Sequence, residues 1–296
     1  MDLPNQLAAF STCYDYMHRH IYRRKNGLDL PTEDSKICDD SYLAFKLFTS
    51  YVHERGGGAP TVRYSTEHRN AIVNVITEYG YPIDNVGFEQ AIRKNDFASK
   101  VWTSFEKQCV KHKIETNEKN TVGPVRQFIE KLSEEQQPNW LTLLKTKDIS
   151  DAFAWLDSLN GVGPKIAAFI TRDLTTIMKL WPYDRIEEDE MWQLQPVDTW
   201  VARWSVYCFP ENSLIRGINP ETINSQTEKK KIELMKEITE ECEYARVDSA
   251  QFNKGAWFVG SYFGSDLGLK AAVNDEPKIQ ELLDLLYSAF VVKKFI

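Results

Sequence analysis

The chain has 296 residues with 42% hydrophobic and 27% charged side chains, which is ordinary for a globular protein and enough for one large domain or two smaller ones. Its net charge of −7 argues against a protein that coats nucleic acid without specificity, although a site-specific enzyme needs only a local basic face. The N-terminus lacks a signal-peptide apolar run and no stretch resembles a membrane span, so we expect a cytoplasmic protein without a membrane partner.

Several segments place apolar residues at i, i+3, i+4 and i+7, which is the spacing of an amphipathic helix. These segments are 72–79, 125–132 with Pro124 in its first turn, and 279–290. Residues 42–52 are apolar on most sides, which predicts a buried helix. Since no segment shows the sustained alternation of a strand, we expect an all-α fold of helices joined by short loops.

Breaks in the helical pattern mark loops and one insertion. Gly56–Pro60 predicts a flexible loop, and Pro138-Asn139 marks a second boundary. The stretch 181–195 is acidic, and we interpret it as a solvated insertion. Two basic runs, 23–25 and 229–231, are more typical of solvated helix faces than of DNA contacts.

The five cysteines are scattered without a CxxC pair, and all five histidines lie within the first 112 residues. Zinc and iron–sulfur sites require clustered ligands. The sequence therefore predicts no metal site and no histidine-dependent nucleophile in the C-terminal two-thirds. An odd number of dispersed cysteines is typical of a reducing compartment.

The string Leu-Asn-Gly-Val-Gly-Pro-Lys-Ile-Ala at 159–167 predicts a tight hairpin between two helices. Gly161 and Gly163 permit the sharp turn, and Val162 fills the gap between the helices. Pro164 suits the first turn of the second helix, where its missing N–H costs nothing. The free N–H groups and the positive dipole end of that helix form a site for DNA phosphate. A plain turn between packed helices is the alternative, which the length of the string disfavours.

A second string, Pro-Val-Asp-Thr-Trp-Val-Ala-Arg, follows at 196–203. In this order the two strings resemble the helix-hairpin-helix DNA glycosylase superfamily, which includes endonuclease III and the 8-oxoguanine glycosylases. The resemblance is concentrated in residues 149–209. In that family the lysine after the hairpin is the nucleophile of bifunctional glycosylase/lyases, and the second string carries the family's aspartate. The resemblance therefore implies that Lys165 and Asp198 are catalytic.

Excision of a base requires a carboxylate near the sugar, and Asp198 is the candidate. Cleavage of an N-glycosidic bond builds positive charge on the deoxyribose, which a neighbouring carboxylate stabilises. A position at the N-terminus of a predicted helix would favour the ionised form of Asp198. On its own, Asp198 would be interpreted as a helix N-cap, and that role is compatible with catalysis.

Lys165 is the candidate nucleophile of the same reaction. An unprotonated lysine amine can attack the anomeric carbon of the sugar and form a Schiff base. Burial and the positive end of the helix that begins at Pro164 would both lower the pKa of Lys165. A lysine that binds phosphate beside the hairpin is the alternative, and it stays open.

Base excision also requires a pocket, because the target base must leave the stack. The segment 255–263 is rich in aromatic and small residues and resembles the late helix that lines the base pocket of 8-oxoguanine glycosylases. The resemblance implies that Phe263 stacks on the base, with Trp257 as the next candidate. A core helix explains most of the other rings.

The family fold implies two helical lobes with the active cleft between them. One lobe, about residues 40–178, would be a helical barrel that ends in the hairpin. The other would combine 1–39 with 179–296 and carry Asp198, so that Lys165 and Asp198 meet across the cleft. The cysteine cluster of endonuclease III is missing, so no cofactor is required, while a monovalent cation at the hairpin is compatible with the resemblance.

The leading interpretation is a DNA glycosylase with β-lyase activity that acts as a monomer on double-stranded DNA containing a modified base. The long connection between Lys165 and Asp198 is most like that of the archaeal 8-oxoguanine glycosylase subgroup, which makes 8-oxoguanine the leading substrate. One alternative is a monofunctional glycosylase for another modified or hypermodified base, in which Asp198 activates water and Lys165 positions DNA. The others are a non-catalytic helix-hairpin-helix DNA-binding protein and a helical interaction protein with a chance motif.

Overall fold

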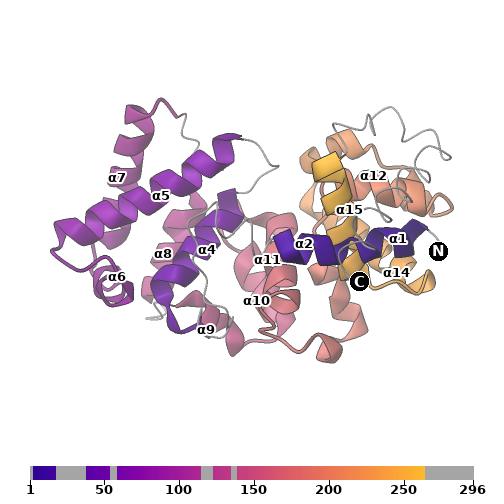
Figure 1. Ribbon diagram of the computed structural model, residues 1–296, viewed down its shortest axis with the longest axis horizontal. Helices are drawn as coiled ribbons and strands as arrows, with labels where there is room; N and C mark the ends of the chain where they lie inside the picture. The colour runs from indigo at the N-terminus through magenta and orange to yellow at the C-terminus, as the bar shows by residue number, and fades with distance from the viewer. Residues whose placement is uncertain (1–2, 18–37, 54–58, 115–122, 135–138, 264–296) are drawn as a thin grey trace. The chain divides into compact units, whose positions relative to one another are not determined.

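All secondary structure in the described part of the chain is helical, which confirms the all-α class (Figure 1). The computed structural model describes residues 3–17, 38–53, 59–114, 123–134 and 139–263. The expected helix at 279–290, the basic run at 23–25 and most of the glycine loop at 56–60 lie outside these residues. None of the described helices is long and apolar enough to cross a membrane.

The chain divides into two compact units. Unit 1 comprises the described residues of 1–21, 167–177 and 182–296, and unit 2 comprises those of 22–166 and 178–181. The division falls inside helix α11, so the first turn of this helix belongs to unit 2 and the remainder to unit 1. The sequence-based expectation instead drew the boundary after residue 178, beyond the end of α11.

Unit 2 contains the hairpin and most of the helices that precede it. Its helix α4 is buried along nearly its whole length, as the sequence predicted for residues 42–52. The 72–79 pattern falls on α5 except for Tyr79, which follows the last helical residue, and the 125–132 pattern falls on α8. The helices of unit 2 are α4 (Ser41–His53), α5 (Ala59–Glu78), α6 (Asn85–Ile92), α7 (Phe97–Lys111), α8 (Gly123–Glu134), α9 (Trp140–Lys145), α10 (Ile149–Asp157) and the first turn of α11 (Gly163–Thr176).

An aromatic cluster forms the core of unit 2. Phe128 of α8 stacks on Phe48 of α4 with ring centroids 3.8 Å apart, and it also meets Phe45, Trp140 and Trp155. Phe48, Phe128 and Trp140 are fully buried. The indole N–H of Trp140 donates to a backbone carbonyl of α4 at 2.9 Å, so its polar atom is satisfied. The cluster ties α10, the helix that leads into the hairpin, to α4, α8 and α9.

Unit 1 is organised around α15, which contacts α1, α2, α12, α14 and the 3-10 helix η5 (Figure 1). A Cβ on Gly255 of α15 would lie 1.7 Å from the carbonyl oxygen of Leu7, so only glycine lets α1 approach this closely. The helices of unit 1 are α1 (Leu3–Ala9), α2 (Ser11–Met17), the rest of α11, η4 (Tyr183–Arg185), η5 (Glu188–Leu194), α12 (Thr199–Cys208), α13 (Ser213–Arg216), η6 (Pro220–Ser225), α14 (Glu228–Tyr244) and α15 (Ser249–Phe263).

The acidic stretch 181–195 is only partly the solvated insertion that the sequence predicted. Residues 187–189 are exposed, but Gln193, Leu194 and Gln195 are buried. The difference arises because η5 packs on α14 and α15, which turns one side of this short helix toward the interior. The part of the stretch next to the Pro-Val-Asp string is therefore core rather than surface.

The aromatic cluster makes a prediction about stability. Phe128→Ala removes the ring shared by the whole cluster and should lower the free energy of unfolding by about 3–5 kcal/mol, as expected for a fully buried phenylalanine. Urea denaturation followed by circular dichroism measures this change. The control is Val110→Ala on α7, where the side chain is 79% exposed and the loss should stay within about 0.5 kcal/mol. Equal losses in the two variants would contradict the assignment of this core.

Candidate functional site

The hairpin has the backbone geometry that its glycines were expected to allow. Gly161 and Gly163 have φ angles of +80° and +62°, in the left-handed region that favours glycine. The N–H of Val162 donates to the carbonyl of Leu159 at 2.9 Å, and the Val162 side chain is buried. The N–H of Asn160 donates to a side-chain oxygen on α8 at 2.6 Å. The turn is thus closed by its own backbone and anchored to a neighbouring helix.

This geometry separates the roles of the three predicted DNA-binding residues. Because the N–H of Val162 already has an intrachain acceptor, this residue contributes packing rather than a phosphate contact. The N–H groups that a helix leaves without intrahelical acceptors begin here at Gly163, since α11 starts at that residue. Lys165 lies in the first turn of α11 and is half-buried.

Asp198 is the N-cap of α12. Its Oδ1 accepts the backbone N–H groups of Trp200 and Val201, both at 2.9 Å. Oδ2 has no hydrogen-bond partner among the described residues, and the side chain is half-buried. The two hydrogen bonds to Oδ1 fix the orientation of the carboxylate. Oδ2 remains available for another interaction at the positive end of α12. The N-cap and catalytic readings of Asp198 are therefore geometrically compatible.

Two buried polar side chains near Asp198 have atoms without hydrogen-bond partners in the described part of the chain. Gln195 has no solvent exposure, yet neither its amide oxygen nor its amide nitrogen is bonded. Arg203 pairs with Glu221 and lies over the ring of Trp200, but its Nη1 is unbonded. A buried polar atom without a hydrogen bond lowers the stability of the folded protein, and such atoms are uncommon in native interiors. They occur here on both sides of Asp198 in the sequence, which distinguishes this segment from an ordinary part of the core.

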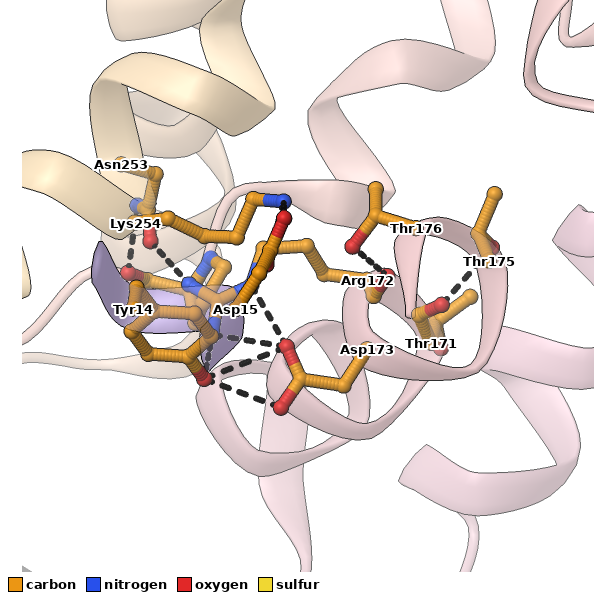
Figure 2. A network of polar contacts seen from close by, with 10 residues as sticks. Tyr14, Asp15, Thr171, Arg172, Asp173, Thr175, Thr176, Asn253 and Lys254 are labelled. Atoms are coloured by element: carbon orange, nitrogen blue, oxygen red, sulfur yellow. Dashed lines mark hydrogen bonds and ion pairs between the residues drawn. The ribbon is translucent and has the colours of Figure 1, made fainter. Parts of the chain in front are cut away.

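A buried polar network joins α2, α11 and α15 within unit 1 (Figure 2). Arg172 of α11 donates through Nε to Oδ1 of Asp173 at 3.0 Å and through Nη2 to the hydroxyl of Tyr14 on α2. That hydroxyl in turn donates to Oδ2 of Asp173 at 2.9 Å. All three side chains are fully buried, so the ion pair is closed off from water and held by hydrogen bonds on each side.

Asn253 of α15 extends this network to the Pro-Val-Asp string. Its Oδ1 accepts a hydrogen bond from Nη1 of Arg172, and its Nδ2 donates to the carbonyl oxygen of Pro196 at 2.9 Å. The next residue, Lys254, donates to both oxygens of Asp15 at 2.9 and 3.1 Å. Burial raises the pKa of the Asp15 carboxyl, while the Lys254 ammonium lowers it and so opposes the shift.

Of the two candidate base-pocket aromatics, only Trp257 has a described side chain. Trp257 is half-buried on α15 and meets the ring of Tyr14 edge-on, with centroids 5.6 Å apart. It therefore borders the polar network at Tyr14. The side chain of Phe263 lies outside the described residues, although its backbone is the last residue of α15.

The remaining reactive groups of the described chain form no competing centre. Among the described residues, no cluster of histidine, cysteine, aspartate or glutamate could hold a metal ion. The five cysteines are not joined by disulfides. Burial raises the pKa of the Cys109 thiol to about 11 and also raises that of Cys242, which makes both thiols poor nucleophiles at neutral pH.

The expected site residues are divided between the two units. Asp198 and Trp257 lie in unit 1, while Gly161, Gly163 and Lys165 lie in unit 2, so the pairing of Lys165 with Asp198 stays a prediction. Sequence reasoning missed Arg172, Asp173 and their partners. The sequence did contain an indication of this network, because Arg172 and Asp173 interrupt the apolar run that follows the hairpin. A charged pair within an apolar run is more typical of a buried, paired site than of a solvated helix face.

Comparison with known proteins provides no relative. No family model, no curated protein and no solved structure matches the chain. Function therefore has to be inferred from the residues and their geometry.

The unbonded amide of Gln195 makes a second prediction. Gln195→Met replaces it with an apolar side chain of similar length and should stabilise the protein by about 1 kcal/mol or more, because a buried amide without partners carries its full desolvation cost. Thermal denaturation measures the change. The control is Gln193→Met, since Gln193 is also buried but has an interaction partner, and this change should bring no gain. Destabilisation in both variants would refute the account of Gln195.

Proposed function

We propose that the protein is a DNA glycosylase of the helix-hairpin-helix type, with β-lyase activity through Lys165, that removes a damaged or modified base from double-stranded DNA. The observation that carries the proposal is the order of two strings whose local structure suits these roles: a glycine hairpin leading into Lys165, followed by Asp198 at a helix N-terminus. The two units would correspond to the two lobes of that fold.

The hairpin supports the DNA-binding half of the proposal. Two glycines with positive φ and a buried valine give a turn that ends at the N-terminus of the fourteen-residue helix α11. A helix N-terminus binds phosphate through backbone N–H groups without reading base sequence. Most of the acidic excess of the chain falls in unit 1, so the hairpin of unit 2 is not set in the strongly negative part of the sequence.

The proposed chemistry uses Lys165 as nucleophile and Asp198 as electrostatic partner. The Lys165 amine, once deprotonated, forms a bond to C1′ of the deoxyribose, while the bond from C1′ to the base breaks and its electron pair leaves with the base. Asp198 stabilises the positive charge that builds on the sugar. The departing base takes up one amine proton. The bond from C1′ to O4′ then breaks, O4′ takes up the second amine proton, and the nitrogen forms the imine with C1′. Proton loss from C2′ then expels the 3′ phosphate and cuts the strand.

The substrate class is a base with a flat ring that can be extruded from the duplex. Trp257, half-buried on α15 in the same unit as Asp198, supports an aromatic wall for such a pocket. 8-Oxoguanine stays the leading candidate because of the long connection between the two strings. Another modified or hypermodified base is the alternative within the same chemistry.

The test is borohydride trapping on duplexes that carry 8-oxoguanine, uracil, an alkylated or hypermodified base, or an abasic site. Wild-type protein should form a covalent adduct that is lost in Lys165→Ala, since reduction fixes the imine to that lysine. Lys229→Ala, which changes an 87% exposed lysine on α14, should trap as the wild type does. The duplex that traps identifies the substrate class.

The carboxylate is tested separately by Asp198→Asn. Asparagine caps a helix as well as aspartate does, so this variant removes the negative charge and retains α12. Base release should fall at least about 100-fold. The matched control is Asp148→Asn, which changes the same kind of cap at the start of α10 and should leave the rate unchanged.

The other outcomes identify the competing functions. Alkali-labile abasic sites without a trapped adduct indicate a monofunctional enzyme in which Asp198 activates water. If no duplex is trapped or loses a base, the glycosylase proposal fails, and a non-catalytic hairpin that binds DNA phosphate becomes the better account of the glycine turn.

A further inference from the structure

We infer that Asn253 is a positioning residue for Asp198, and that it acts by fixing the Pro196 carbonyl to the buried arginine of α11. The inference rests on the proposed function, because it assigns a task within the site that contains Asp198. It goes beyond that function because Asn253 and Arg172 lie outside both the hairpin string and the Pro-Val-Asp string. Asn253 also differs from Phe263 and Trp257, the two residues expected to line the base pocket.

The segment that needs positioning lies between two helices. Residues 195–198 connect η5 to α12 without secondary structure of their own. Pro196 has no N–H to donate, so its carbonyl is the backbone group through which this residue can be held. The carbonyl accepts from Nδ2 of Asn253 at 2.9 Å, two residues before Asp198. A shift of this carbonyl is transmitted directly to the carboxylate.

Asn253 is suited to this task because both ends of its amide are used. Nδ2 holds Pro196, and Oδ1 accepts from Nη1 of Arg172. Its side chain has no solvent exposure, so water does not compete for either bond. Asn253 therefore links Arg172 of α11, beside which Figure 2 shows it, to the Pro196 carbonyl at the start of the Pro-Val-Asp string.

The arginine at the other end of this link is held by several groups. Arg172 is bonded to Asp173 and Tyr14 as well as to Asn253, and its guanidinium lies over the rings of Tyr14 and Phe169 at 4.6 and 5.0 Å. A guanidinium with its donors engaged in several directions has no low-energy alternative orientation. Lys165 precedes Arg172 by about two turns on this helix. Asn253 thus connects the segment that carries Asp198 to Arg172 of α11.

The experiment uses Asn253→Asp and Asn253→Ser in the full-length protein. The aspartate variant keeps an acceptor for Arg172 but replaces the donor to Pro196 with a carboxylate oxygen, which repels the carbonyl oxygen. The serine variant is too short to reach both partners, adds no charge, and serves if the aspartate variant does not fold. The matched control is Ser249→Ala, one turn earlier on α15, where the buried hydroxyl has no hydrogen-bond partner among the described residues.

Hydrogen exchange provides a readout that does not depend on activity. The amides of Trp200 and Val201, which Asp198 caps, should exchange roughly 2- to 10-fold faster in the Asn253 variants, as expected when one supporting hydrogen bond is lost. Ser249→Ala should leave their exchange unchanged. Unchanged exchange in both Asn253 variants overturns the inference whatever the activity.

Kinetics then tests whether the positioning matters for the reaction. Single-turnover base release should fall roughly 10- to 100-fold in the Asn253 variants, with the Kd for DNA changed by less than about threefold, because displacement of a reacting group affects the chemical step rather than binding. Faster exchange with an unchanged rate overturns the inference and leaves the glycosylase proposal standing. Absence of base release by the wild type overturns the glycosylase proposal, and the inference with it.

Discussion

Arg172 and Asp173 are a charged pair with no access to solvent, and the arrangement of unit 1 depends on keeping that pair satisfied. Removing an ion from water still costs several kcal/mol after relaxation, and the pair alone does not offset this cost. The remaining donors and acceptors must be bonded, and they are bonded to Tyr14 of α2 and Asn253 of α15. Three helices from three regions of the sequence are therefore held at one point.

This constraint explains why α11 is divided between the units. Its first turn closes the glycine hairpin of unit 2, while the stretch from Ala167 onward carries the polar pair and belongs to unit 1. The polar pair therefore fixes the part of α11 that lies in unit 1. Removing one member of a buried ion pair typically lowers the free energy of unfolding by about 3–5 kcal/mol. Arrangements in which the two charges are separated are therefore strongly disfavoured.

The sequence predicted the features that depend on local rules. Residues 42–52 form a buried helix, Gly161 and Gly163 adopt positive φ, and Asp198 caps α12, because spacing, glycine and capping preferences act within a few residues. It did not predict the burial of Gln193 to Gln195, because the apolar partners of η5 come from α14 and α15 much later in the chain. The network around Arg172 was missed for the same reason, since its bonds join residues as far apart as Tyr14 and Asp173.

The close fit of α1 against Gly255 has a consequence for the order in which the chain folds. Helices α1 and α2 precede α15 in the chain, and Lys254 of α15 lies 239 residues after Asp15, with which it pairs. At about 5–20 residues per second, these helices wait on the order of tens of seconds for the surface that buries them. Unit 2 draws nearly all its residues from one continuous stretch and can form during this interval. The contacts that bury α1 and α2 are thus formed only after α15 has been synthesised.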